Sequence, residues 1–211
     1  MSFGDLTVER FLDELASKSP APGGGSASAI AAAMGAGLVS MVVALTETSE
    51  MPEDDRARIE QAGARAQELR TELLRCADED TEAFNAVMAA YRMPRATDDE
   101  KQARREAIQK GLKGAANAPM KTLELAMEGL HLAAYMAHKG NKNAVSDAGV
   151  GAQLFNAAAC GAIFNVEINL SGIKDADFVA RARAKVASCD LERERLRKDS
   201  IEAVSERIGG N

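Results

Sequence analysis

Apolar residues recur every three or four positions over most of this chain, which is the spacing of one face of an α-helix. The clearest stretch runs from Pro52 to about Tyr91, where two rows of residues repeat every seven positions. One row holds Ile59, Ala66, Leu73, Asp80 and Val87, and the other holds Ala62, Leu69, Cys76, Ala83 and Ala90. The pattern predicts a long helix with one buried side, and Asp80 is the only charged residue on that side.

The same spacing predicts five further helices. Their expected ranges are 5–18, 26–48, 97–139, 146–170 and 175 to near the C-terminus. Segment 164–170 alternates as a strand would, but no second convincing strand exists to pair with it, so it is assigned to a helix. The chain is therefore predicted to be all-α, with residues 1–211 forming one up-and-down bundle of six or seven helices.

Proline, glycine and serine residues indicate where these helices begin and break. Segment 19–26 is rich in Pro and Gly and is expected not to be helical, with Ser26 as the N-cap of the next helix. Pro119 is expected to break or kink its helix. A turn is predicted at 140–143, and Ser146 is expected to cap the helix that follows it.

The amino-acid composition supports the all-α assignment. Hydrophobic residues make up 46% of the chain, but only 4% are aromatic and none is Trp. A core of Ala, Gly, Leu, Val and Met suits closely packed helices, whereas a β-sandwich needs β-branched and aromatic residues. This apolar content argues against disorder. A net charge of -6 argues against non-specific binding of nucleic acid.

The cysteines and the N-terminal residues bear on the compartment. Cys76, Cys160 and Cys189 are far apart and form no CxxC pair, and the first residues lack the apolar segment of a signal peptide. We therefore expect a reducing, cytoplasmic setting. The charge-free run 19–46 is long enough for a transmembrane helix. Because it is rich in Ala, Gly and Ser and has no flanking aromatic belts or basic clusters, we expect instead a buried helix of a soluble bundle or dimer, with no membrane partner.

Two features near the middle and the start of the chain could carry chemistry. The glycine turn consists of Pro22, Gly23, Gly24, Gly25 and Ser26. Free N–H groups at the helix start that follows can hold a carboxylate or phosphate, although a tight turn between packed helices would look the same. Asp80 is the second feature, since a carboxylate in an apolar row must be paired, hydrogen-bonded or shifted in pKa. Structural polar residues occur at such positions, and so do general acid–base groups.

The third feature is the polar run from His138 to Asp147, which contains two Asn, two Lys, a Ser and an Asp at a junction between helices. A surface turn would look similar. His131 lies seven residues before His138, but no third His, Cys or well-spaced acid completes a metal site, so no zinc site or other metal is predicted.

Five motifs, taken in order, resemble a single family. They are 19–26 before an Ala/Gly-rich helix, 80–84 (DTEAF), 92–95 (RMPR), 140–149 (GNKNAVSDAG) and 165–170 (NVEINL). Together they cover the chain from about Val8 to Asp175 and resemble the formiminotetrahydrofolate cyclodeaminase / methenyltetrahydrofolate cyclohydrolase family. The resemblance implies an all-α, dimer-forming enzyme that acts on the one-carbon unit bridging N5 and N10 of tetrahydrofolate, with no cofactor beyond that carrier.

The resemblance leaves two reactions open. Some members are fused to a formiminotransferase domain and release ammonia, whereas others stand alone and hydrate the methenyl bridge to 10-formyltetrahydrofolate. This chain has 211 residues and lacks the transferase domain, which favours the cyclohydrolase and keeps the cyclodeaminase as the alternative. A non-catalytic helical scaffold that binds a partner through its Ala/Gly faces is a third interpretation.

The chemistry of the reactions that the resemblance implies leads to hypotheses about the candidate residues. Asp80 is expected to exchange protons with the substrate, and Lys139 and Asp147 are expected to complete the catalytic group. The residues expected to bind folate are Pro22, Gly23, Gly24, Gly25, Ser26, Asn141, Asn143, Ser146, Asn165 and Asn169. Asp147 and Asn165 are 18 residues, or roughly 27 Å, apart along one helix. These residues therefore either contact opposite ends of a folate or form a site shared across a dimer interface.

Overall fold

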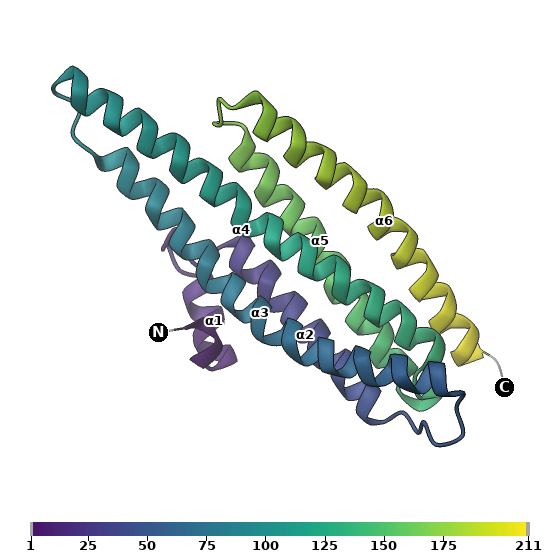
Figure 1. The fold of residues 1–211 in the computed structure, drawn as a ribbon. Helices are drawn as coiled ribbons and strands as arrows, with labels where there is room; N and C mark the ends of the chain where they lie inside the picture. Colours follow the sequence, from purple (N-terminus) through teal and green to yellow (C-terminus); the bar gives the residue numbers. More distant parts are fainter. Residues whose placement is uncertain (1, 210–211) are drawn as a thin grey trace.

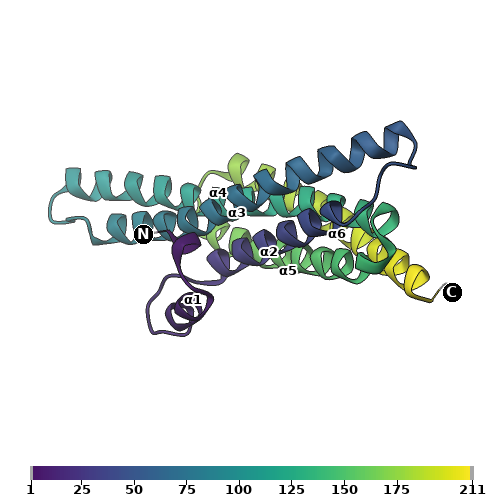
Figure 2. The same ribbon diagram turned by 90° about the horizontal axis from the view of Figure 1, so that it is seen from below.

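The computed structural model describes residues 2–209, which form six α-helices and two short 3₁₀ turns, with no strand among them. The elements are η1 (Phe3–Asp5), α1 (Val8–Leu15), α2 (Gly24–Ala44), α3 (Glu53–Arg92), α4 (Asp98–Lys139), η2 (Lys142–Ala144), α5 (Val145–Leu170) and α6 (Ala176–Gly209). Helices α2 to α6 run up and down along a common long direction, and α1 lies to the side near the start of α2 (Figures 1 and 2). The predicted all-α bundle is confirmed.

The seven-residue rows predicted for α3 are also confirmed. All their members are buried except Ala83 and Asp80, which are partly buried. The two rows pack against α2 and α4, which are the main neighbours of α3. Asp80 is thus the one carboxylate that the α3 packing face carries into the bundle.

Small residues allow the helices to approach one another closely. Helix α2 packs against α3 and α5, and α5 also packs against α4. The fully buried ring of Phe155 in α5 fits between Gly35 of α2 and Gly129 of α4, and a methyl group at Gly129 would overlap that ring. The absence of a side chain at these two glycines therefore leaves the space that the Phe155 ring fills.

Helix α2 and the segment Lys142–Leu170 are both long and apolar enough to cross a membrane, judged by length and composition alone. In the bundle they lie against each other and against α4, so much of their apolar surface is used in packing. Part of it faces outward: Met34, Phe164 and Ile168 are 54%, 74% and 71% exposed.

The structure corrects four predicted helix boundaries. Helix α1 covers only Val8–Leu15, and α4 continues through the buried Pro119, so the break expected there as one of two alternatives does not occur. Helix α2 starts at Gly24 with Gly23 as its N-cap, so the end of segment 19–26 is helical. Ser26 is not the N-cap, because its hydroxyl is directed at α3 instead.

Ser146 is the fourth correction. Helix α5 starts at Val145 with Ala144 as its N-cap, directly after the 3₁₀ turn η2. Ser146 therefore lies within the first turn of the helix rather than at its cap. The 3₁₀ turn leads into the helix without the extended residue that a serine cap requires.

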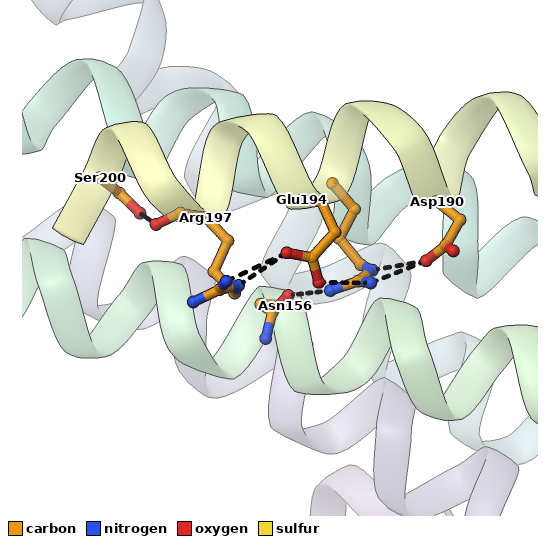
Figure 3. Close-up of polar contacts among 6 residues, drawn as sticks. Asn156, Asp190, Glu194, Arg197 and Ser200 are labelled. Carbon is orange, nitrogen blue, oxygen red and sulfur yellow. Dashed lines mark hydrogen bonds and ion pairs between the residues drawn. The ribbon is translucent and has the colours of Figure 1, made fainter. Parts of the chain in front are cut away.

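A buried arginine fastens α6 to α5. Arg193 is 7% exposed, and its guanidinium donates to Asp190 Oδ1 at 2.7 and 2.9 Å and to Asn156 Oδ1 at 2.6 Å (Figure 3). Glu194 lies 2.9 Å from the same group. Two carboxylates and an amide thus satisfy the buried cation, as burial of a charge requires. We read this cluster as a structural contact between the two helices.

Candidate active site

A cavity of about 400 Å³ lies where the start of α2 meets α3 and the last turns of α5. Its lining consists of Pro20, Ala21, Gly23, Gly24, Gly25, Asp80, Phe84, Val87, Met88, Tyr91, Ala115, Asn165, Ile168 and Asn169. The walls are mainly apolar and aromatic, and one carboxyl group, two amides and the backbone of the glycine turn supply the polar contacts. This combination is typical of a small-molecule binding site.

A second cavity of similar size, about 420 Å³, lies between α5 and α6. Its lining includes Ser146, Gln153 and Ser200 but no carboxylate, amine, imidazole or thiol. Because acid–base chemistry needs an ionisable group, the cavity that contains Asp80 is the better candidate.

The Asp80 carboxyl group lies against the first turn of α2. Ser26 Oγ is 3.2 Å from Asp80 Oδ2, 3.0 Å from Ala77 O and 3.3 Å from Thr81 Oγ1. The backbone N–H of Ser26 also donates to the carboxyl group. A methyl group at Gly25 would overlap this carboxyl group, so glycine is what allows it to approach the helix start.

Two opposing influences set the pKa of Asp80. Burial raises the pKa above its ordinary value of 3.8, while the hydrogen bonds from the side chain and backbone of Ser26 lower it. Burial dominates, so the net pKa is raised. A carboxyl group with a raised pKa exchanges protons closer to neutral pH, as a general acid–base group must.

Asn165 and Asn169 occupy successive turns of α5 and both line the cavity, which confirms the prediction that they face one groove. Asn165 Nδ2 donates to Gly161 O at 2.8 Å. Asn169 Nδ2 donates to Asn165 O at 2.8 Å and to Ala115 O of α4 at 2.9 Å. The amides therefore place fixed polar groups opposite the carboxyl group of Asp80.

The apolar wall was missed at the level of the sequence. Phe84, Val87, Met88 and Tyr91 continue the face of α3 that carries Asp80, at helical spacing toward its C-terminal end. A signal was available, since large apolar and aromatic residues three, four and seven positions apart follow Asp80. The same spacing is compatible with an apolar wall of a binding site as well as with core packing.

The structure divides the predicted site residues into two groups. The first group lines the cavity and consists of Gly23, Gly24, Gly25, Asp80, Asn165 and Asn169. Ser26 contacts Asp80 through its hydroxyl group, and Pro22 is buried within the glycine turn. The other predicted residues lie at the opposite end of α5: Lys139, Asn141, Asn143, Ser146 and Asp147. Within one chain this second group does not line the cavity of Asp80. Its participation in a site shared between two subunits stays a prediction.

Contacts within the chain occupy several of these distant residues. Lys139 Nζ is 2.8 Å from Asp55 Oδ2, and this contact lowers the pKa of Asp55. The Asn141 backbone donates to Thr46 Oγ1 at 2.9 Å, and its side chain donates to Leu45 O at 2.5 Å. These polar groups join the turn after α4 to the end of α2 and the start of α3.

The two histidines lie between α4 and α6. His131 Nε2 is 3.0 Å from Glu192 Oε1, and His138 Nε2 is 3.1 Å from Asp199 Oδ1. Over residues 2–209, no three side chains of His, Cys, Asp or Glu converge as a metal-binding group.

The family model described as Formiminotransferase-cyclodeaminase matches residues 7–188. The chain belongs to this family. A methenyltetrahydrofolate cyclohydrolase from Methylorubrum extorquens is 39% identical over 97% of this chain and 99% of its own length. A formimidoyltransferase-cyclodeaminase from Gallus gallus is 37% identical over 80% of this chain, which corresponds to 31% of that longer protein.

A solved structure shares the fold of this family member. The formiminotetrahydrofolate cyclodeaminase from Thermotoga maritima superposes with a TM-score of 0.86 at 28% identity, over 97% of this chain and 98% of that one. The Formiminotransferase-cyclodeaminase family thus includes proteins of this length that carry either name. The resemblance seen in the five motifs is confirmed.

Proposed function

We propose that this chain is a methenyltetrahydrofolate cyclohydrolase, which hydrates 5,10-methenyltetrahydrofolate to 10-formyltetrahydrofolate. The observation that carries the proposal is the partly buried Asp80 carboxyl group, with its raised pKa, at the wall of a cavity of about 400 Å³. The near full-length likeness to the cyclohydrolase of Methylorubrum extorquens supports the choice of reaction.

Asp80 supplies the proton transfers of this reaction. Its carboxylate takes a proton from a water molecule as the water oxygen bonds to the bridging carbon, which gives a neutral tetrahedral carbon held by N5 and N10. Asp80 then returns the proton to N5 as the carbon–N5 bond breaks, and the new hydroxyl group loses its proton to solvent as the formyl C=O forms. One proton is released for each substrate cation hydrated, so the charges balance. A positioned acid–base group contributes about 10²- to 10⁴-fold in rate.

The rest of the cavity binds and orients the folate. The pterin ring lies between the apolar wall of α3 and the amides of Asn165 and Asn169. Gly24 and Gly25, in the first turn of α2, present backbone N–H groups that can hold an anionic or carbonyl oxygen. Ser26 orients Asp80 rather than contacting the substrate.

The protein acts as a homodimer, or a higher homo-oligomer, in the cytoplasm. The outward surface of α2 and α5 carries no charge between residues 148 and 166 of α5, where Gln153 is exposed, and it also carries the exposed Met34 and Phe164. Ile168 is both exposed on this surface and part of the cavity lining, so a second copy seated there would border the site. Lys139 and Asp147 lie at the other end of α5 and do not line this cavity, so the site proposed here does not depend on them.

The cyclodeaminase reaction is the second candidate. It is favoured by the Thermotoga maritima structure, which carries that name and is matched over 98% of its length. In this reaction N10 attacks the formimino carbon, and Asp80 protonates the nitrogen that leaves as ammonia. The same carboxyl group serves both reactions, because each passes through a tetrahedral carbon bonded to N5 and N10.

Absorbance at the methenyltetrahydrofolate band separates the two reactions. Purified protein is mixed with 5,10-methenyltetrahydrofolate at neutral pH, and the cyclohydrolase removes the band much faster than buffer alone. Appearance of the band from 5-formiminotetrahydrofolate together with ammonia, without the first activity, would establish the cyclodeaminase. Folded protein that is silent in both assays would contradict an enzymatic function and favour a helical scaffold.

A further inference from the structure

Pro119 changes the hydrogen bonding of α4 next to the cavity. In an uninterrupted α-helix, the carbonyl oxygen of residue 115 accepts from the N–H of residue 119. Proline has no N–H, so Ala115 O loses this donor although α4 continues through Pro119. Pro119 is fully buried, and Ala115 lines the cavity.

The side chain of Asn169 takes the place of the missing donor. Asn169 Nδ2 lies 2.9 Å from Ala115 O and 2.8 Å from Asn165 O. Both partners are carbonyl oxygens, which only accept, so the atom facing them must be the NH₂ group of the amide. The two N–H bonds of Asn169 are thereby occupied, and Oδ1 is left as the polar atom with no partner among residues 2–209.

We propose that Pro119 is a positioning residue for substrate recognition. By withholding an N–H from Ala115 O, it fixes the amide of Asn169 with Oδ1 as a hydrogen-bond acceptor for the ligand. The cavity wall then selects an N–H group on the edge of the bound heterocycle, and a pterin ring carries such groups. This inference rests on the proposed folate function and specifies which kind of ligand edge faces α5.

A purely structural role for Pro119 predicts a different outcome. If its ring only shapes α4, replacing it alters the cavity whether or not Asn169 is present. If Pro119 acts through Asn169, replacing Pro119 no longer changes ligand affinity once the Asn169 amide is removed. A double-mutant cycle measures this difference directly.

The cycle consists of Pro119→Ala, Asn169→Ala and the double variant. The readouts are kcat, KM and the Kd of 5-formyltetrahydrofolate, a stable ligand with the same pterin ring. In Pro119→Ala, the new N–H at 119 competes with Asn169 for Ala115 O, so the amide of Asn169 is held mainly by its bond to Asn165 O and is positioned less firmly. We expect Kd and KM to rise about three- to ten-fold with kcat changed less than two-fold. In the Asn169→Ala background, the same substitution should change Kd less than two-fold.

An equal rise in Kd in both backgrounds, or an unchanged Kd in folded Pro119→Ala, would overturn the proposal. Asn169→Asp provides a second test if the proline variant fails to fold, because it keeps the shape of the side chain and removes both N–H donors. Its Kd should rise, because the carboxylate keeps an acceptor oxygen but loses the two N–H bonds that hold it in place, and an unchanged Kd would contradict the proposal. Turnover of 5-formiminotetrahydrofolate alone would refute the cyclohydrolase assignment without affecting the binding cycle, since both substrates carry the same ring.

Discussion

The two ends of α5 carry similar polar residues and use them differently. At its C-terminal end, Asn165 and Asn169 face Asp80 across a cavity with apolar walls. At its N-terminal end, Asn141 bonds to the backbone and side chain of the α2 end, and Lys139 pairs with Asp55. The C-terminal cluster presents polar atoms to the cavity, where a ligand can reach them. At the N-terminal end, Asn141 and Lys139 instead form hydrogen bonds and an ion pair within the protein.

The difference shows that chemistry at a polar cluster depends on its surroundings. Asp80 has a raised pKa because it is buried in a helix-packing face, next to a helix start that glycine leaves open. Asp55, beside Lys139, has a lowered pKa because its main partner is a cation. The lysine favours the ionised form of Asp55, whereas burial raises the pKa of Asp80 and so brings its proton exchange closer to neutral pH.

The largest expected effect comes from Asp80→Asn. Asparagine fills the same space but cannot exchange a proton, so kcat with 5,10-methenyltetrahydrofolate should fall about 10²- to 10⁴-fold. Asp147→Asn is the matched control at the other end of α5, and its kcat should change less than three-fold. A large loss in Asp147→Asn, with the oligomeric state unchanged, would place that end in a site shared with a partner subunit.

Gly25→Ala should have the next largest effect. A methyl group there would overlap the Asp80 carboxyl group and push it from its position, so kcat should fall about 10- to 100-fold. Gly24→Ala is the control, because its methyl group would meet Asn165 Nδ2 at 3.4 Å, close to ordinary contact. Equal losses in the two folded variants would argue against a specific need for glycine at position 25.

Much of this account could be predicted from the sequence, because helical periodicity reports burial directly. The repeat in α3 identified both the buried face and Asp80 as its exception. The helix starts were less predictable: the signal for a serine cap at Ser26 was present, but that hydroxyl is used by α3, 51 to 55 residues away in the chain. Contacts between distant segments also decide which polar residues line a cavity, and spacing along one helix does not contain that information.

Ser26→Ala should have a smaller effect, visible in the pH dependence. The Ser26 hydroxyl stabilises the carboxylate and lowers the pKa of Asp80, so its removal should raise that pKa. Because Asp80 acts as a base when ionised, the acid limb of the kcat/KM profile should move to higher pH, by about one unit or less. A shift to lower pH would contradict the assigned hydrogen bond.

Lys139→Met should have the smallest effect. Its partner Asp55 and the lysine itself lie at the surface, where ion pairs contribute little. We expect kcat within about two-fold of the unmodified protein and a melting temperature lower by about 2 °C or less. A ten-fold loss of kcat would refute the structural role and indicate contact with the substrate.

The most direct test of the central claim is to measure the pKa of Asp80 itself. Carbon-13 NMR of the labelled carboxyl group, assigned with Asp80→Asn, gives this pKa, and the acid limb of kcat/KM for 5,10-methenyltetrahydrofolate gives the kinetic one. We predict that the two values agree and lie above the ordinary 3.8. An Asp80 that titrates at or below 3.8, or an acid limb that persists unchanged in Asp80→Asn, would contradict its role as the proton-transfer group.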